Sequence, residues 1–228
     1  MITWAAGMYW AYSARAWCGL FASLTDGRVL LRHEITWLRV APEDARADFI
    51  ERLNGFGIGI PRDAEARGLQ PLRYVVAQAG IFPKAARSGS GETISETFSR
   101  VGIPMRCADM DEINGWTRLR AWLRTRDHED KSTNPPTMFA SPSLLVHPDC
   151  KYFLRTFPTL ISDAVDPDLI VATIDAYPAF GARYYVMSRP APASKPPVAP
   201  PPKHSIYYDV EKIRRQHDRP RLGADNVI

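Results

Sequence analysis

The chain has 228 residues, of which 45% are hydrophobic and 24% are charged, as is typical of a globular domain with a substantial core. No apolar run approaches the roughly 18 residues of a membrane-spanning helix, so none is predicted. The three cysteines are far apart and form no CxxC pair, which argues against a zinc site and against a disulfide framework.

The formal net charge of +4 favours a nucleic-acid or phosphate partner only weakly, because part of the excess lies near the C-terminus. Residues 191–228 hold seven of the 29 Lys and Arg residues and four of the 25 Asp and Glu residues. The preceding residues are therefore almost neutral, with 22 basic and 21 acidic side chains. A DNA contact in that part of the chain requires a local cluster of basic side chains.

Residues 7–38 predict an antiparallel meander, because they are rich in aromatic and β-branched types. Asp26-Gly27 stands between two apolar runs and is a strong signal for a hairpin turn. We expect strands near 7–13, 16–23 and 28–38. Pro42 then begins a helix with Phe49 and Leu53 at helical spacing.

Strands are predicted to alternate with helices in the middle of the chain. Leu72–Gln78 is a short apolar run of the kind found in buried parallel strands. A later helix places Trp116 and Leu119 on one apolar stripe. The expected ranges are a strand at 72–78, a loop at 88–91, a helix at 92–101, a strand at 105–108, a helix from 111 to about 124, a loop at 126–136, a strand at 144–147 and helices at 149–161 and 177–188. This alternation indicates a mixed α/β sheet.

The C-terminal part differs in composition from the rest. Seven prolines fall in the thirteen residues from Pro190 to Pro202, which predicts an extended linker. The last residues combine charge with little apolar content, so we expect a flexible charged tail. The predicted organisation is a folded domain at 1–189, a proline-rich linker at 190–202 and a tail at 203–228.

Three collinear stretches carry family-like motifs: GMYWAYSARAWCGLFASLTDGRVLLRHEITW at 7–37, YVVAQAGIFPKAARSGSGETISETFSRVGIPMRCADMDEINGWTRLRAWL at 74–123 and CKYFLRTFPTLISDAVDPDLIVATIDAYPAFGARYYVMSRP at 150–190. Together they resemble the nuclease domain of the large subunit of viral DNA-packaging terminases. The resemblance implies a ribonuclease-H-like α/β fold, with a mixed sheet of an antiparallel meander and parallel strands, flanked by helices.

Active members of that family hydrolyse phosphodiesters with two Mg²⁺ or Mn²⁺ ions held by three carboxylates. Carried over residue by residue, the three aspartates fall at Tyr9, Gln78 and Phe180. The histidine that precedes the third falls at Tyr177, and its acidic neighbour falls at Ala176. A phenol that ionises near pH 10, a neutral amide and a phenyl ring are not ligands for a hard divalent cation. We therefore predict no metal site and no other cofactor.

The missing carboxylates do not depend on the details of the alignment. No acidic residue occurs from Met1 to Leu24 or from Ala66 to Ser90, the windows that hold the first and the central strand. Glu34 in the third strand is the nearest acidic candidate in the meander. A glutamate in a strand is more often a solvated or paired edge residue than a metal ligand.

Four arginines are candidates for DNA binding. Arg118, Arg120 and Arg124 recur along the helix that begins at residue 111, and a stripe of arginines suits contact with a phosphate backbone. Arg183 lies beside the predicted site and could hold a phosphate without a metal. The alternative for Arg183 is an ion pair with a nearby carboxylate.

The resemblance leaves three functions open: a catalytically inactive nuclease-type domain of a phage or prophage terminase, an active metal-dependent endonuclease with relocated ligands, and a non-catalytic packaging or interaction module. No GxxxxGK[ST] motif occurs, so no ATPase motor is predicted within these residues. The expected partners are double-stranded DNA and packaging components such as the portal or a motor subunit, with no membrane. The apolar N-terminus lacks a basic segment, so no signal peptide is expected and the host cytoplasm is the predicted location.

Overall fold

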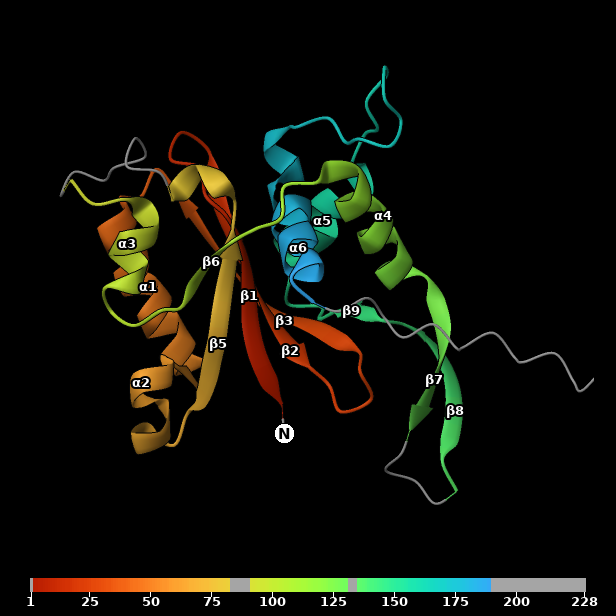
Figure 1. The fold of residues 1–228 in the computed structure, drawn as a ribbon, viewed down its shortest axis with the longest axis horizontal. Helices are drawn as coiled ribbons and strands as arrows, with labels where there is room; N and C mark the ends of the chain where they lie inside the picture. The colour runs from red at the N-terminus through yellow and green to blue at the C-terminus, as the bar shows by residue number, and fades with distance from the viewer. Residues whose placement is uncertain (1, 83–90, 131–134, 190–228) are drawn as a thin grey trace, which may run out of the picture. The chain divides into compact units, whose positions relative to one another are not determined.

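The computed structural model describes residues 2–82, 91–130 and 135–189, and a mixed sheet forms the centre of these residues (Figure 1). Strands β1 (Thr3–Tyr9), β2 (Arg15–Ser23) and β3 (Val29–Leu38) form the predicted antiparallel meander. The turn between β2 and β3 contains Gly27 at φ 86°, a conformation that glycine adopts without strain.

Parallel strands extend the meander on both sides. The sheet order is β4-β5-β1-β2-β3-β9, and β6 also pairs with β5. Strand β5 (Gln70–Ala77) lies parallel to β1, and β4 (Ile58–Gly59), β6 (Met105–Cys107) and β9 (Leu144–Val146) also join in parallel. This mixed sheet is the predicted ribonuclease-H-like architecture.

Helices cover both faces of the sheet and create two cores (Figure 1). On one side lie α1 (Pro42–Gly55), α2 (Pro61–Ala64) and α3 (Ile94–Ser99), and on the other lie α4 (Glu112–Leu123), α5 (Lys151–Thr156) and α6 (Tyr177–Met187). Strand β2 serves both cores, because successive side chains point to opposite faces. Trp17 packs on the α4–α6 side, and Cys18 packs on the α1 side.

Helix α6 lies directly against β1 and β2, which fixes the position of its side chains over the sheet. Tyr185 stacks on Phe21 of β2 with ring centroids 3.9 Å apart. Gly7 of β1 faces Gly181 of α6, and a Cβ atom at Gly7 would collide with the Gly181 carbonyl oxygen. The pair of glycines therefore permits the close approach of helix and strand.

The sequence prediction differs from the structure at the first strand and at the predicted loop 126–136. Strand β1 spans Thr3–Tyr9 instead of residues 7–13, and it ends at Tyr9 because the backbone of Trp10 forms hydrogen bonds with the Gln78 side chain. The first part of this loop is instead strand β7 (Thr125–Asp130), which pairs antiparallel with β8 (Thr137–Pro142), and residues 131–134 lie outside the described residues. The hairpin forms through cross-strand contacts such as the ring contact of His128 with Phe139, at 5.8 Å.

The helix predicted at 149–161 is also shorter than expected. Helix α5 ends at Thr156, and a 3₁₀ turn follows over Phe157–Thr159, where Pro158 cannot continue α-helical hydrogen bonding. Most of the predicted loop 88–91, the linker 190–202 and the tail 203–228 lie outside the described residues. The chain divides into two units, 1–192 and 193–228, and the second lies wholly outside them. In the described part of the chain, no helix is long and apolar enough to cross a membrane.

Candidate functional site

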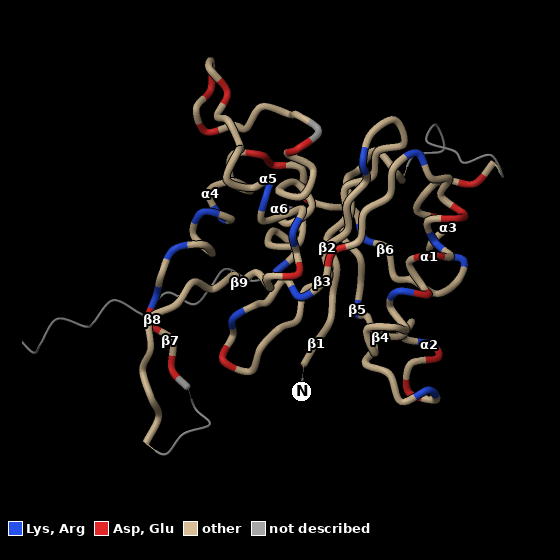
Figure 2. Tube along the Cα trace, turned by 180° about the vertical axis from the view of Figure 1, so that it is seen from behind, with Lys and Arg blue, Asp and Glu red and all other residues tan. Residues whose placement is uncertain are grey.

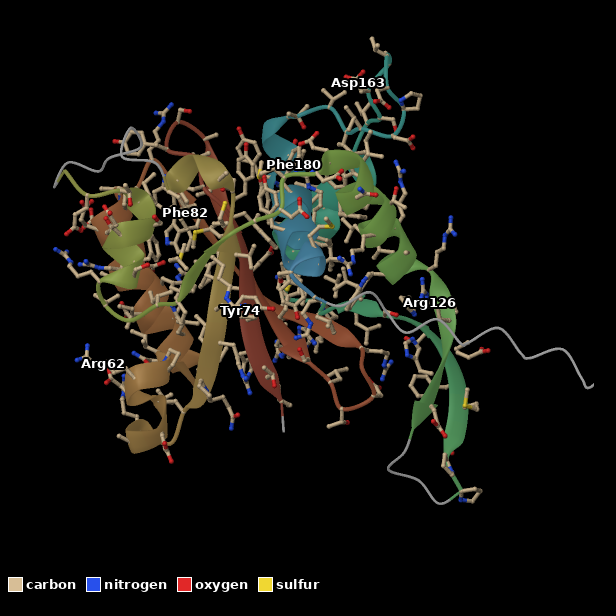
Figure 3. The ribbon with its side chains drawn as sticks, viewed as in Figure 1. Arg62, Tyr74, Phe82, Arg126, Asp163 and Phe180 are labelled. Carbon is tan, nitrogen blue, oxygen red and sulfur yellow. The ribbon has the colours of Figure 1, made fainter. Side chains whose placement is uncertain are left out.

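The three positions carried over from the family meet at one end of the sheet. Tyr9 is the last residue of β1, and Gln78 follows the last residue of β5. The two strands are parallel neighbours with Met8 opposite Ala77, so their carboxyl ends lie side by side. Phe180 projects from α6 near this end of the sheet (Figure 3). The fold therefore brings together residues that are up to 171 positions apart in the sequence.

Gln78 joins the ends of the two strands through its side-chain amide. Its Oε1 accepts a hydrogen bond from the Trp10 backbone N–H at 2.9 Å, and its Nε2 donates to the Trp10 carbonyl oxygen at 2.6 Å. A carboxylate can accept the first bond but cannot donate the second. The amide is therefore chemically matched to a backbone that offers one donor and one acceptor.

Tyr9 is the centre of an aromatic stack on the adjoining part of the site. Its ring lies 4.3 Å from that of Tyr177, 5.6 Å from that of Phe180 and 6.3 Å from that of Tyr184. Burial is the main cause that raises the pKa of Tyr9, so the phenol stays neutral near pH 7. Phe180 also packs edge-on against Trp116 of α4, with ring centroids 5.2 Å apart.

These side chains do not fit a hard divalent cation. The amide atoms of Gln78 are both engaged by Trp10, Tyr9 is a neutral phenol, and Phe180 has no ligand atom. Tyr177 belongs to the stack, and Ala176 is fully buried. Across residues 2–82, 91–130 and 135–189, no group of three or more His, Cys, Asp or Glu side chains is placed to hold a metal ion.

Glu34 lies on the α4–α6 side of the sheet, where it holds helix α5. Its carboxylate accepts hydrogen bonds from the Trp17 indole N–H at 3.0 Å and from the backbone N–H groups of Tyr152 and Phe153 at 2.6 and 3.0 Å. The first N–H groups of a helix have no partner within the helix, so a carboxylate there stabilises the helix end. Glu34 is thus a paired residue, which is the commoner role of a glutamate in a strand.

Arg183 is fully buried between α4 and α6, at 0% side-chain exposure. Its Nη1 lies 3.3 Å from Glu112 Oε1, a contact that has ion-pair distance without hydrogen-bond geometry. The guanidinium carbon also lies 5.0 to 5.2 Å from three aromatic ring centroids, those of Trp116, Phe180 and Tyr184. A Cβ atom at Gly115 would lie 2.8 Å from Arg183 Cδ, so the glycine makes room for the arginine.

The other three candidate arginines have separate environments on or beside α4. Arg118 donates to the Met187 carbonyl oxygen at 3.4 Å, and Arg120 pairs with Asp168 at 3.4 Å. Arg124 is exposed just after the helix ends. Basic residues thus follow one another along α4 toward β7 (Figure 2). Arg183, in contrast, is buried and does not reach the surface.

Sequence reasoning overlooked Glu112 and Tyr184 as members of the site. Tyr184 stacks over Tyr9, and Glu112 is the carboxylate nearest to Arg183. The spacing of Tyr177, Phe180 and Tyr184 at i, i+3 and i+7 was a usable signal, because it places all three rings on one helical face. No comparable signal in the sequence pointed to Glu112.

No protein-family model and no curated protein sequence matches the chain. The large terminase of a thermophilic bacteriophage is similar in structure, with a TM-score of 0.55 and 13% identity over 82% of this chain. This chain covers 39% of that terminase chain. The nuclease domain of the P22 large terminase is similar with a TM-score of 0.53 and 14% identity, over 82% of this chain and 81% of that domain. The chain therefore has the ribonuclease-H-like fold of a large-terminase nuclease domain.

Proposed function

We propose that this chain is the nuclease-type domain of a phage or prophage DNA-packaging terminase large subunit and that it does not cut DNA. The observation that carries the proposal is the set of contacts at the three ligand positions. Both amide atoms of Gln78 form hydrogen bonds with Trp10, while the rings of Tyr9 and Phe180 pack against each other. A two-metal hydrolase needs anionic oxygen ligands at these places to hold the ions and activate water.

The partners follow from the same proposal. The similar structures are those of large terminases, and one of them was determined in complex with ADP. We propose double-stranded DNA and packaging components, the portal and a motor subunit, as the partners of this chain in the host cytoplasm. ATP hydrolysis would come from polypeptide outside these 228 residues, because no GxxxxGK[ST] motif occurs within them.

The test is cleavage of supercoiled plasmid in millimolar Mg²⁺ and Mn²⁺. Three proteins are compared: the parent, a variant with Tyr9→Asp, Gln78→Asp and Phe180→Asp, and a matched variant with asparagine at the same positions. The asparagine variant copies the size of the aspartates without their charge. Circular dichroism and thermal melting, with and without Mn²⁺, report whether each variant folds and binds the ion.

The parent and the asparagine variant are expected to leave the plasmid intact, and the aspartate variant is expected to nick it in a metal-dependent way. Metal-dependent cleavage by the purified parent would overturn the proposal and favour an active endonuclease with relocated ligands. If the aspartate variant folds but neither cuts nor gains melting temperature with Mn²⁺, the assignment of the three positions is wrong. Inactivity of the parent would then favour a non-catalytic packaging module.

A further inference from the structure

Three arginines from separate elements surround the last residues of α6. Arg106 belongs to β6, Arg118 belongs to α4, and Arg189 follows the end of α6. Arg106 is exposed, whereas Arg118 and Arg189 are partly buried, and the Nε atom of Arg189 is buried without a hydrogen-bond partner. They are far apart in the sequence, so the cluster exists only in the folded domain.

A chain of contacts holds this arginine cluster together. The Arg106 guanidinium lies 4.2 Å from the centre of the Tyr74 ring, and the Tyr74 hydroxyl lies 3.3 Å from Ser188 Oγ. On the other side, Arg118 donates to the carbonyl oxygen of Met187 at 3.4 Å. Arg189 comes next in the chain after Ser188. The guanidinium groups of Arg106 and Arg118 are thus held near Met187 and Ser188, and Arg189 is the next residue of the chain.

The cluster contains no ion pair with a carboxylate among the described residues, in contrast to other arginines of the chain. Arg120 pairs with Asp168, Arg100 pairs with Glu92, and Arg52 pairs with Asp48. The carboxyl end of a helix favours nearby cations, so the end of α6 offsets part of the repulsion within the cluster. The contacts with Tyr74 and Met187 also leave most of each guanidinium's donors free.

The arginine cluster is separate from the aromatic site. Tyr177 and Phe180 lie in the first half of α6, whereas Met187 is its last residue. Ten residues of helix at 1.5 Å each place Tyr177 and Met187 about 15 Å apart along the axis. Figure 3 shows the same separation, with Phe180 near the carboxyl end of β1 and Tyr74 farther back along β5.

The chemistry of the cluster favours a phosphate backbone over an apolar protein surface. Arginine presents a fork of donors that suits phosphate oxygens. Protein interfaces take most of their binding energy from buried apolar and aromatic anchors. In the described part of the chain, none of the exposed large hydrophobic side chains lies in β6 or at residues 187–189, and the one on α4 is Ile113, in its first turn.

We propose that Arg106, Arg118 and Arg189 form a binding surface for the phosphate backbone of duplex DNA, distinct from the degenerate catalytic end of the sheet. The inference rests on the proposed function only in its choice of DNA as the phosphate source. The surface would let a domain that does not cut DNA still hold it. Arg118 was already a candidate from the sequence, and the structure gives it different companions from Arg120 and Arg124.

The test is fluorescence anisotropy of a labelled 20-base-pair duplex, titrated with the full chain in EDTA from 50 to 200 mM salt. EDTA prevents cleavage, so binding is measured whatever the nuclease assay shows. The test variant carries Arg106→Gln, Arg118→Gln and Arg189→Gln. The matched control carries Arg62→Gln, Arg67→Gln and Arg73→Gln, three exposed arginines with the same total charge. Competition with inorganic phosphate and pyrophosphate distinguishes a small-anion site from a surface for the duplex.

The test variant should bind at least about tenfold more weakly at 100 mM salt, and its slope of log affinity against log salt should fall by about 2 to 3. The control should change affinity less than about twofold. A lysine variant at the three test positions should keep most of the slope, because its charge is unchanged. If the glutamine variant does not fold, Arg106→Gln alone, on an exposed side chain, should reduce the slope by about 0.9.

Equal losses in the test and control variants would show a non-specific charge effect and overturn the inference. Failure of the parent to bind duplex would do the same while leaving the loss of cleavage as proposed. Displacement of the duplex by millimolar inorganic phosphate would assign the cluster to a small anion instead. Metal-dependent cleavage by the parent together with a selective loss in the test variant would overturn the proposed function and support the DNA surface.

Discussion

The side chains around the first end of α6 are paired within the fold, whereas the arginines around its last residues keep free hydrogen-bond donors. At the first end, Gln78, Tyr9 and Phe180 satisfy one another or the backbone, and no charged side chain stands at the three ligand positions. At the other end, Arg106 and Arg118 keep free donors. Groups that are satisfied internally stabilise a fold, whereas charges without internal partners are available to a ligand. The comparison predicts that changes at the aromatic end alter stability and that changes at the arginine end alter binding.

Phe180→Ala should have the largest effect on stability and tests the aromatic end directly. The ring is 5% exposed and packs against Tyr9 and Trp116, so its removal leaves a cavity in the core. We expect a loss of about 3 to 5 kcal/mol in the free energy of unfolding, measured by urea denaturation. Arg106→Ala, at the other end, should cost less than about 1 kcal/mol. Similar losses in the two variants would contradict the contrast.

Alkaline pH should also act on α6, through Tyr184 beside Tyr9 and through Tyr185 on Phe21. Burial raises the pKa of Tyr184 and of Tyr185 to about 12, from an ordinary value near 10. The unfolded chain therefore loses these protons at lower pH than the folded chain does. The stability that they contribute is fully present below pH 10 and is lost as the pH rises toward 12. Melting temperatures measured from pH 9 to 12 should fall, and Tyr184→Phe should make the fall shallower.

Gln78→Glu tests the bridge between the ends of β1 and β5. The substitution keeps an acceptor for the Trp10 N–H, removes the donor to the Trp10 carbonyl and sets a carboxylate near that oxygen. We expect a loss of about 2 kcal/mol in urea denaturation at pH 7. Gln78→Met, which removes both bonds without adding charge, is the control and should cost less. A glutamate variant as stable as the parent would show that the amide donor is dispensable.

The smallest expected effect is that of Mg²⁺ on the parent. An ion that binds the folded state must raise the melting temperature, and the side chains at the three ligand positions offer no anionic oxygen. The melting temperature should therefore stay constant, within about 0.5 °C, between zero and 10 mM MgCl₂ at fixed ionic strength. The variant with three aspartates, which is the positive control, should gain several degrees. A clear rise in the melting temperature of the parent with MgCl₂ would show that the folded domain binds the ion and would contradict the contrast between the two ends of α6.

The fold could be predicted from the sequence where the pattern is local. The Asp26-Gly27 turn and the apolar run at 72–78 placed the second and third strands and the central strand close to their observed bounds, whereas the first strand was predicted four residues too late. The β7–β8 hairpin was missed, because Thr125–Asp130 has no alternating apolar face and pairs through cross-strand contacts. Its formation depends on partners in the other strand, such as Pro142 opposite Thr125 and Phe139 opposite His128.

The sequence named the candidate positions but not their contacts. The resemblance brought Tyr9, Gln78 and Phe180 together by analogy, and the structure places them at one end of the sheet. The bond between Gln78 and Trp10 spans 68 positions, and no spacing rule predicts such a partner. The burial of Arg183 likewise depends on the missing side chain at Gly115, which belongs to a different helix.

The amide of Gln78 has a consequence for how such a domain could change over generations. A single replacement by aspartate would break one hydrogen bond and still lack the other two carboxylates, so it would weaken the fold without restoring a metal. The same holds for Tyr9 and Phe180, whose rings support each other. The route back to an active nuclease thus requires several coordinated changes, each unfavourable alone. Under our proposal, the lost activity is protected against reversion by the packing that replaced it.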